Sequence, residues 1–157
     1  MLAGRLAAER WNFPVLLRER LRGGVNRLLP TVHLPLGPLR KLQPDQWQGA
    51  QTCNLAVARG DLDRIDGFDC AYTGWGLEDS DLVVRLLHAG VRRKDGRFAT
   101  GVLHLWHPQN DRSRLPANKS RLDDVVGGSR VRALHGLSML GADGEPSPRR
   151  DPSMAPP

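Results

Sequence analysis

The clearest hydrophobic pattern in the chain lies between residues 78 and 89. Acidic residues open this segment, where they suit the positive end of a helix dipole, and Gly90 follows it as a stop signal. Large aliphatic residues recur within it at helical spacing, at Leu82, Val83, Leu86 and Leu87. The pattern predicts an α-helix over Glu78–Ala89.

The rest of the chain predicts shorter elements. Aliphatic residues among arginines over 1–29 indicate one or two helices, punctuated by Pro14 and Gly23-Gly24, and the proline-rich stretch 30–49 is expected to be extended or looped. The tail 141–157, dominated by Gly, Pro, Ser and charge, is expected to be disordered. The remaining predicted elements are a buried strand at Cys53–Val57, a helical turn at Asp61–Ile65, a tight turn at Gly67–Asp69, a strand over Phe98–Trp106 and a helix within 118–140 that Gly127-Gly128 interrupts.

Composition is that of a soluble globular domain with a modest core. Of the 157 residues, 39% are hydrophobic and 25% are charged, which excludes a long disordered tract. The apolar run Phe13–Leu17 is far shorter than the ~20 residues of a spanning helix, and charges interrupt any signal-peptide pattern. Cys53 and Cys70 lack metal or redox spacing and are expected to be buried thiols. We therefore expect a cytoplasmic protein, either free or peripheral at the inner face of the membrane.

The net charge of +6 is unevenly distributed. Residues 1–49 hold eight Lys and Arg against three Asp and Glu, whereas residues 50–110 hold seven against eight. A nucleic-acid surface combines basic residues with aromatic ones, but Trp75 and Trp106 stand beside carboxylates and histidines. Nucleic acid is therefore not an expected partner. The basic segment 1–46 fits either an anionic membrane surface or a surface helix packed on the domain.

Two adjacent carboxylates follow a Gly-Trp-Gly turn. Glu78 and Asp79 can simply cap the helix that starts there. However, Trp75 offers a flat apolar face on which a sugar ring can stack, and Gly76 lets the backbone turn closely. Carboxylates accept hydrogen bonds from sugar hydroxyls and can remove a proton from an attacking hydroxyl. The block therefore predicts a carbohydrate site, with helix capping as the alternative.

His104 and His107 form a second candidate group. On a strand, residues three apart point to opposite faces, so the pair would not easily chelate one ion. If the chain turns at Trp106, His107 can point into a site while His104 supports it. One imidazole added to carboxylates or to a substrate diphosphate suits Mn²⁺ or Mg²⁺. The alternative is that both histidines are structural.

Four blocks of the chain, in their order, resemble the C-terminal half of GT-A-type family 2 glycosyltransferases, a half similar to the C-terminal domain of β-1,4-galactosyltransferases and chondroitin-type polymerases. The blocks are Cys53–Val57, Ile65–Asp69, Gly74–Leu82 and His104–Pro108. The sequence of these blocks most resembles bacterial enzymes that assemble lipopolysaccharide or other surface glycans. The resemblance implies a partial α/β GT-A fold, divided into a basic helical and proline-rich segment 1–46, an acceptor and catalytic domain 47–140 and the tail 141–157.

The resemblance also implies the roles of the site residues. Asp79 would be the general base that deprotonates an acceptor hydroxyl, and Glu78 would bind acceptor hydroxyls. Trp75 and Gly76 would shape the pocket for acceptor and donor sugar, and Asn54 would brace it.

A metal and two substrates are implied as well. His107 would bind manganese, His104 falls where some relatives place a second ligand, and Asp69 would brace the site. The implied reaction is inverting transfer of a hexosyl group, such as galactosyl, from a nucleotide sugar to a glycan acceptor, with Mn²⁺ or Mg²⁺ stabilising the departing diphosphate.

The chain departs from the family pattern in two places. Thr52 stands where relatives commonly have glycine. The nucleotide-binding half, with an Asp-x-Asp motif after an apolar strand, has no counterpart in residues 1–49. Two tripeptides have the same pattern, Asp61-Leu62-Asp63 and Asp79-Ser80-Asp81, but both lie inside the region of resemblance and are not expected to be this motif. We therefore expect a truncated or partial transferase. The alternative is a non-catalytic carbohydrate-binding fragment.

Overall fold

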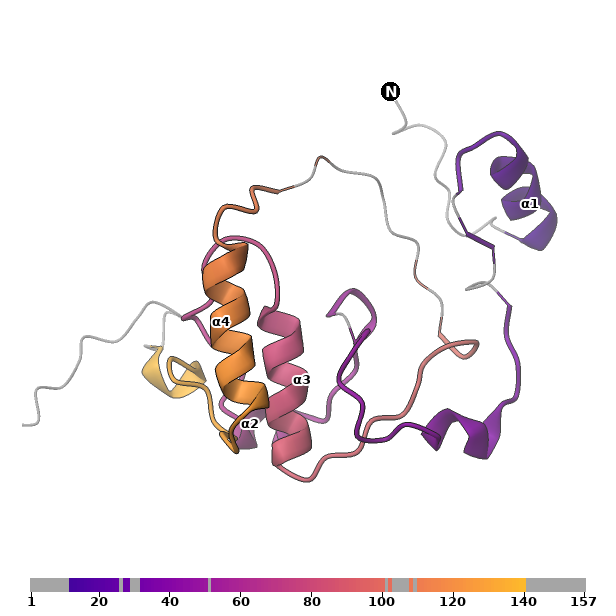
Figure 1. Ribbon diagram of the computed structural model, residues 1–157. Helices are drawn as coiled ribbons and strands as arrows, with labels where there is room; N and C mark the ends of the chain where they lie inside the picture. Colours follow the sequence, from indigo (N-terminus) through magenta and orange to yellow (C-terminus); the bar gives the residue numbers. More distant parts are fainter. Residues whose placement is uncertain are drawn as a thin grey trace, which may run out of the picture. The chain divides into compact units, whose positions relative to one another are not determined.

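The computed structural model describes residues 12–25, 27–28, 32–50, 52–100, 102, 108 and 110–140. The chain divides into two units. The first comprises residues within 1–43 and 94–105, and the second comprises residues within 44–93 and 106–157. The regular elements of the described residues are α-helices and short 3₁₀ helices (Figure 1). The partial α/β GT-A fold, the division at residues 46 and 140 and the disordered tail therefore stay predictions, and the tail lies outside the described residues.

The first unit begins with α1 (Phe13–Leu21). The Asn12 side chain accepts a hydrogen bond of 3.2 Å from the Val15 N–H and caps this helix, which Pro14 starts rather than interrupts. Gly23 follows the helix with a φ of +77°, as the Gly-Gly stop predicted. No helix in the described part of the chain combines the length and apolar character needed to cross a bilayer. Membrane-surface binding by the basic segment stays a prediction.

The first unit also contains the 3₁₀ helix η3 (Gly37–Lys41). Arg40 pairs with Asp95 through two hydrogen bonds: its carbonyl accepts from the Asp95 N–H at 2.9 Å, and its Nε donates to the Asp95 carbonyl at 2.7 Å. Phe98 lies in a turn with a φ of +61°, so the strand predicted over Phe98–Trp106 does not begin there. Most of that segment lies outside the described residues.

The second unit is built around α3 (Glu78–His88), which packs side by side with α4 (Leu115–Val126) (Figure 1). The predicted helix is thus confirmed. It ends in a Schellman turn, because the Gly90 N–H donates to the Leu87 carbonyl at 2.9 Å and the Val91 N–H donates to the Leu86 carbonyl at 3.0 Å. The predicted stop at Gly90, with a φ of +83°, is confirmed too.

Both sides of α3 are buried, because two hydrophobic clusters contact it. One cluster contains Ile65, Leu82, Leu86 and Ala89. The other contains Val84, Leu122 and Val125, with Trp47 and Leu77 packed against it. The positions of α3 between Asp81 and Leu86 are all buried, which is wider than the apolar face that the sequence predicted. The first turn of this helix is therefore held in place by packing on two sides.

The strand predicted at Cys53–Val57 is wrong. Thr52–Asn54 form the 3₁₀ helix η4, and the residues that follow are irregular and no more than half-buried. A strand needs a paired neighbour to satisfy its backbone groups, and a short apolar run does not by itself supply one. Cys53 and Cys70 are both exposed free thiols, so their predicted burial is also wrong.

The helical turn predicted at Asp61–Ile65 is confirmed as α2 (Arg59–Arg64). The helix predicted within 118–140 is correct only in part. It begins earlier, as α4 at Leu115, and ends at the predicted glycines; beyond them the chain is irregular apart from the 3₁₀ helix η5 (Leu137–Met139). The glycines terminate the helix rather than interrupt it.

Candidate functional site

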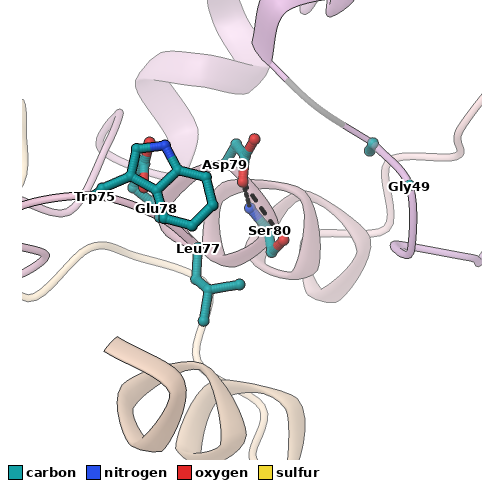
Figure 2. A pocket seen from close by; sticks show the side chains of 8 residues that line it. Gly49, Trp75, Leu77, Glu78, Asp79 and Ser80 are labelled. Carbon is teal, nitrogen blue, oxygen red and sulfur yellow. Dashed lines mark hydrogen bonds between the residues drawn. The ribbon is translucent and has the colours of Figure 1, made fainter. Parts of the chain in front are cut away.

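A pocket of about 190 Å³ opens at the N-terminus of α3 (Figure 2). It is smaller than the roughly 300–1,000 Å³ clefts that hold drug-sized ligands. Four of the predicted site residues contribute to it. The lining residues are Gly49, Ala50, Trp75, Gly76, Leu77, Glu78, Asp79 and Ser80.

The turn before α3 has an unusual backbone. Gly74 and Gly76 have φ values of +72° and +102°, which glycine adopts without strain. Leu77 also lies in the left-handed region, with a φ of +76°, at a cost of about 1–2 kcal/mol for a residue with a side chain. Its side chain packs on the cluster shared by α3 and α4 and points away from Asp79 in Figure 2. Tertiary packing therefore holds the turn that presents the pocket residues.

Asn118 on α4 anchors this turn through hydrogen bonds to its backbone. Its side chain is 1% exposed, and Nδ2 donates hydrogen bonds to the carbonyls of Thr73 at 3.2 Å and Gly76 at 3.0 Å. These bonds satisfy two backbone acceptors on either side of Trp75. Sequence reasoning missed Asn118, because a polar residue near the start of a helix usually faces water.

The two carboxylates occupy the first turn of α3. Asp79 Oδ1 accepts a hydrogen bond of 2.7 Å from the Ser80 N–H and lies 3.5 Å from Ser80 Oγ (Figure 2). Glu78 Oε2 is buried and has no hydrogen-bond partner among the described residues. A buried acceptor without a partner is costly, and a ligand hydroxyl would relieve that cost. Capping explains the bond from the Ser80 N–H to Asp79, but it leaves this oxygen of Glu78 unexplained.

Trp75 stands at the edge of the pocket. It is 38% exposed, and the Arg112 guanidinium lies 4.3 Å from the centre of its ring. This spacing is that of a cation–π contact. The predicted aromatic surface is therefore present, and one of its faces carries a cation that sequence reasoning did not anticipate.

The opposite wall of the pocket belongs to the segment that contains Gly49 and Ala50. Arg93 holds this segment: its Nη1 donates to the carbonyls of Gln46 at 2.9 Å and Gln48 at 2.8 Å. Its own N–H donates to the Pro44 carbonyl at 2.8 Å. Arg93 therefore fixes the backbone of the segment that carries Gly49 and Ala50.

A buried ionic network lies behind the pocket. Asp81 Oδ2 accepts from Arg85 Nε at 2.7 Å, and Oδ1 accepts from Arg130 Nη2 at 3.3 Å. Arg130 Nη1 also donates to Asp69 Oδ2 at 2.9 Å. Because Asp81 lies two residues after Asp79, this network fixes the turn of α3 that carries the pocket carboxylates. Tyr72 contacts the same region, and burial together with the Asp81 carboxylate raises its pKa.

Asp69 binds the chain that follows α4. Oδ2 accepts from the Leu134 N–H at 2.9 Å, and Oδ1 accepts from the N–H groups of Ala71 at 3.0 Å and His135 at 3.3 Å. Burial favours the neutral carboxyl, but the hydrogen bonds from Leu134, Ala71 and Arg130 outweigh it and lower the pKa of Asp69. The bracing predicted for Asp69 concerns this segment and the ionic network; Asp69 does not line the pocket.

Asp66 binds the same segment further along. Its two carboxylate oxygens accept from the N–H and the Oγ of Ser138 at 2.8 and 2.7 Å, and Arg132 lies 3.2 Å away. Burial raises the pKa of Asp66, but the hydrogen bonds from Ser138 and the charge of Arg132 lower it on balance. Gly67 permits this close approach, since a Cβ there would come within 2.6 Å of Leu137 Cγ.

The other predicted site residues lie apart from the pocket or beyond description. Asn54 is exposed on η4 and does not line the pocket. His104 and His107 lie outside the described residues. Within the part of the chain that is described, no three His, Cys, Asp or Glu side chains are grouped to hold a metal ion. The histidine roles and the metal therefore stay predictions.

The part of the chain that contains this pocket is similar to known proteins. Residues 41–108 match the family model described as the N-terminal domain of galactosyltransferase. Chondroitin sulfate synthase 3 from Homo sapiens and its counterpart from Mus musculus are each 38% identical to the chain over 52 residues, or 33% of this chain. The chain spans only 6% of the length of these curated relatives. No solved structure shows a significant match.

The segment that is similar to these glycosyltransferases contains every lining residue of the pocket. Two finer predictions do not follow from these matches. The matching model is described as an N-terminal domain, whereas the resemblance assigned the segment to a C-terminal half. The two relatives are mammalian, and they give no support to a bacterial lipopolysaccharide enzyme.

Proposed function

We propose that the chain carries the acceptor-binding and catalytic part of an inverting glycosyltransferase, which moves a hexosyl group from a nucleotide sugar to a glycan acceptor. The observation that carries the proposal is the pocket in which Glu78 and Asp79 accompany Trp75. Its residues all lie within the segment that matches the galactosyltransferase model. Because the chain spans only 6% of the length of the matched relatives, the proposal is for a truncated or partial transferase, and the assay below tests whether the chain transfers sugar by itself.

Asp79 is the proposed general base. It would take the proton of an acceptor hydroxyl while the hydroxyl oxygen forms a bond to the anomeric carbon of the donor sugar. The bond from that carbon to the diphosphate would break on the opposite side, which inverts the configuration. The packing of α3 on both sides supports this role, since a base must be held within reach of the proton that it removes.

Glu78 and Trp75 are the proposed acceptor ligands. The buried, unpaired Oε2 of Glu78 would accept a hydrogen bond from an acceptor hydroxyl. The exposed part of the Trp75 ring would stack on the apolar face of the sugar, and Gly76 would leave room for it. Asn54 keeps its proposed bracing role from outside the pocket.

A divalent metal is part of the proposal for the complete site. Mn²⁺ or Mg²⁺, bound by His107 and secondarily by His104, would stabilise the negative charge of the leaving diphosphate. The carboxylates of the pocket are oxygen donors of the kind that such hard cations accept.

Transfer from UDP-galactose to a panel of methyl β-glycosides, with Mn²⁺ present, tests the proposal. We expect Asp79→Asn to lower turnover by on the order of 10²–10⁴-fold. Asp124→Asn is the matched control, because Asp124 is exposed on α4 away from the pocket. Near-normal turnover of Asp79→Asn would remove Asp79 from the role of base.

The competing function is a non-catalytic carbohydrate-binding fragment. Titration calorimetry separates the two. If the chain binds a methyl glycoside but neither UDP-galactose nor Mn²⁺, the enzymatic proposal fails for this chain and the binding function stands.

A further inference from the structure

Arg112 and Trp75 form a contact that the proposed reaction does not use. The Arg112 guanidinium lies 4.3 Å from the centre of the Trp75 ring. Arg112 stands just before α4, where its carbonyl accepts the Leu115 N–H at 3.0 Å, and Trp75 belongs to the turn that Asn118 of α4 anchors. Both residues therefore attach to the same end of α4, and the cation is held at the edge of the pocket.

No acidic side chain in the described part of the chain forms an ion pair with Arg112. Its neighbour Asp111 is turned toward Ser113: the Asp111 oxygens accept from the Ser113 N–H at 3.0 Å and from Ser113 Oγ at 2.5 Å. Arg114, next along the chain, packs its aliphatic stem against the Gly74 backbone. The exposed Arg112 guanidinium thus has no ion-pair partner in the described part of the chain and lies over an aromatic ring that lines a pocket.

The Arg112 side chain donates no hydrogen bond within the described part of the chain, so its N–H donors are available to a ligand. A guanidinium placed over an aromatic ring uses its planar face, while its N–H donors lie in its plane and point outward. Such donors bind carboxylate and phosphate oxygens through charge-assisted hydrogen bonds. A neutral sugar on Trp75 has no group that needs these donors, whereas an oxyanion attached to the sugar does.

We propose that Arg112 is a specificity-determining residue that binds an anionic group of the sugar held beside Trp75. This inference rests on the proposed sugar-binding function of the pocket. Two sources supply the same oxyanion chemistry: a carboxylate on the ring of an acidic sugar, and the phosphate that links a donor sugar to its nucleotide. The pocket carboxylates Glu78 and Asp79 engage hydroxyl groups, so Arg112 supplies the complementary charge at the pocket edge.

Titration of the full chain with matched ligand pairs tests the proposal. Methyl β-glucuronide and methyl β-glucoside differ by the carboxylate, and UDP and uridine differ by the diphosphate. We expect Arg112→Gln to raise the dissociation constant of at least one anionic ligand roughly tenfold or more, as expected for a charge-assisted hydrogen bond, with the glucoside unchanged. Loss of glucuronide binding identifies the acidic sugar as the source, and loss of UDP binding identifies the phosphate.

Two further variants separate local recognition from general charge. Arg112→Lys keeps the cation and should retain part of the preference. Arg121→Gln removes an exposed arginine from α4 and should leave all four dissociation constants unchanged. If Arg112→Gln alters the charged and neutral ligands equally, or tightens both, then Arg112 merely covers Trp75 and the proposal is overturned.

The wild-type chain gives a second decisive result. Equal affinity for glucuronide and glucoside, together with equal affinity for UDP and uridine, would overturn the role of Arg112 while leaving sugar binding intact. Absence of binding to all four ligands would instead refute the proposed function on which the inference rests.

Discussion

Arg85 and Asp81 lie one turn apart on α3 and form an ion pair of 2.7 Å, with both side chains at 0% exposure. Arg85 Nη1 also donates to the carbonyls of Ile65 and Gly67, each at 2.9 Å. Further hydrogen bonds help to repay the desolvation of a buried ion pair. Here they satisfy Nε and Nη1 of Arg85, whereas its buried Nη2 has no partner among the described residues. Arg85 therefore joins α3 to the turn that precedes Asp69.

Removal of Arg85 should strongly destabilise the second unit. Arg85→Ala removes the donor of Asp81 Oδ2 and of the Ile65 and Gly67 carbonyls, while Asp81 Oδ1 keeps Arg130. Breaking a buried pair typically costs about 3–5 kcal/mol. Urea unfolding measures the loss. Arg59→Ala is the matched control, because Arg59 and Asp63 form an ion pair at the same spacing in solvent. Equal losses in the two variants would contradict the importance of the buried pair.

Asn118→Ala should affect both stability and binding. The variant leaves the carbonyls of Thr73 and Gly76 without their donor, at a cost of about 1–3 kcal/mol, and loosens the turn that carries Trp75. Urea unfolding and titration with methyl β-glucoside measure the two effects. Ser120→Ala, exposed on the same helix, should change neither. Unchanged sugar affinity in a folded Asn118→Ala variant would mean that the turn keeps its shape without this anchor.

Stability should fall in acid because of Asp66 and Asp69. Both have folded-state pKa values below the ordinary 3.8, so the unfolded chain binds more protons and stability rises with pH in this range. Their contribution should be complete above about pH 4 and should be lost as the pH falls through the folded-state values.

The free energy of unfolding between pH 2 and pH 6 measures this effect. Asp69→Asn should flatten the dependence, because the variant no longer exchanges that proton. Asp61→Asn is a control on the neighbouring helix α2, for which a wild-type slope is expected. A wild-type slope in Asp69→Asn would exclude Asp69 as a source of the pH dependence.

Some features of this protein follow from local sequence. The bounds of α3 were predictable because its acidic start, aliphatic spacing and Gly90 stop all act within one helix. The grouping of Trp75, Gly76, Glu78 and Asp79 in a pocket was predictable for the same reason, since they lie within one turn and the start of the helix that follows. The strand at Cys53–Val57 failed because a short apolar run does not specify a partner.

The tertiary structure decided what depends on distant contacts. Asp66 and Asp69 bind groups 65 to 72 residues away, and neither spacing nor composition indicates those partners. Asp81 and Arg85 stand at helical spacing beside Leu82 and Leu86, so the sequence shows two charged residues next to an apolar face. Only the tertiary structure shows that this ion pair is buried in the core and not solvated. The sequence by itself determined that Trp75, Gly76, Glu78 and Asp79 lie together, because that information is local, whereas Gly49 and Ala50 join them only through the tertiary structure. Packing determined how firmly the pocket is held and that Arg112 lies over Trp75, because both depend on which distant segments the fold brings together.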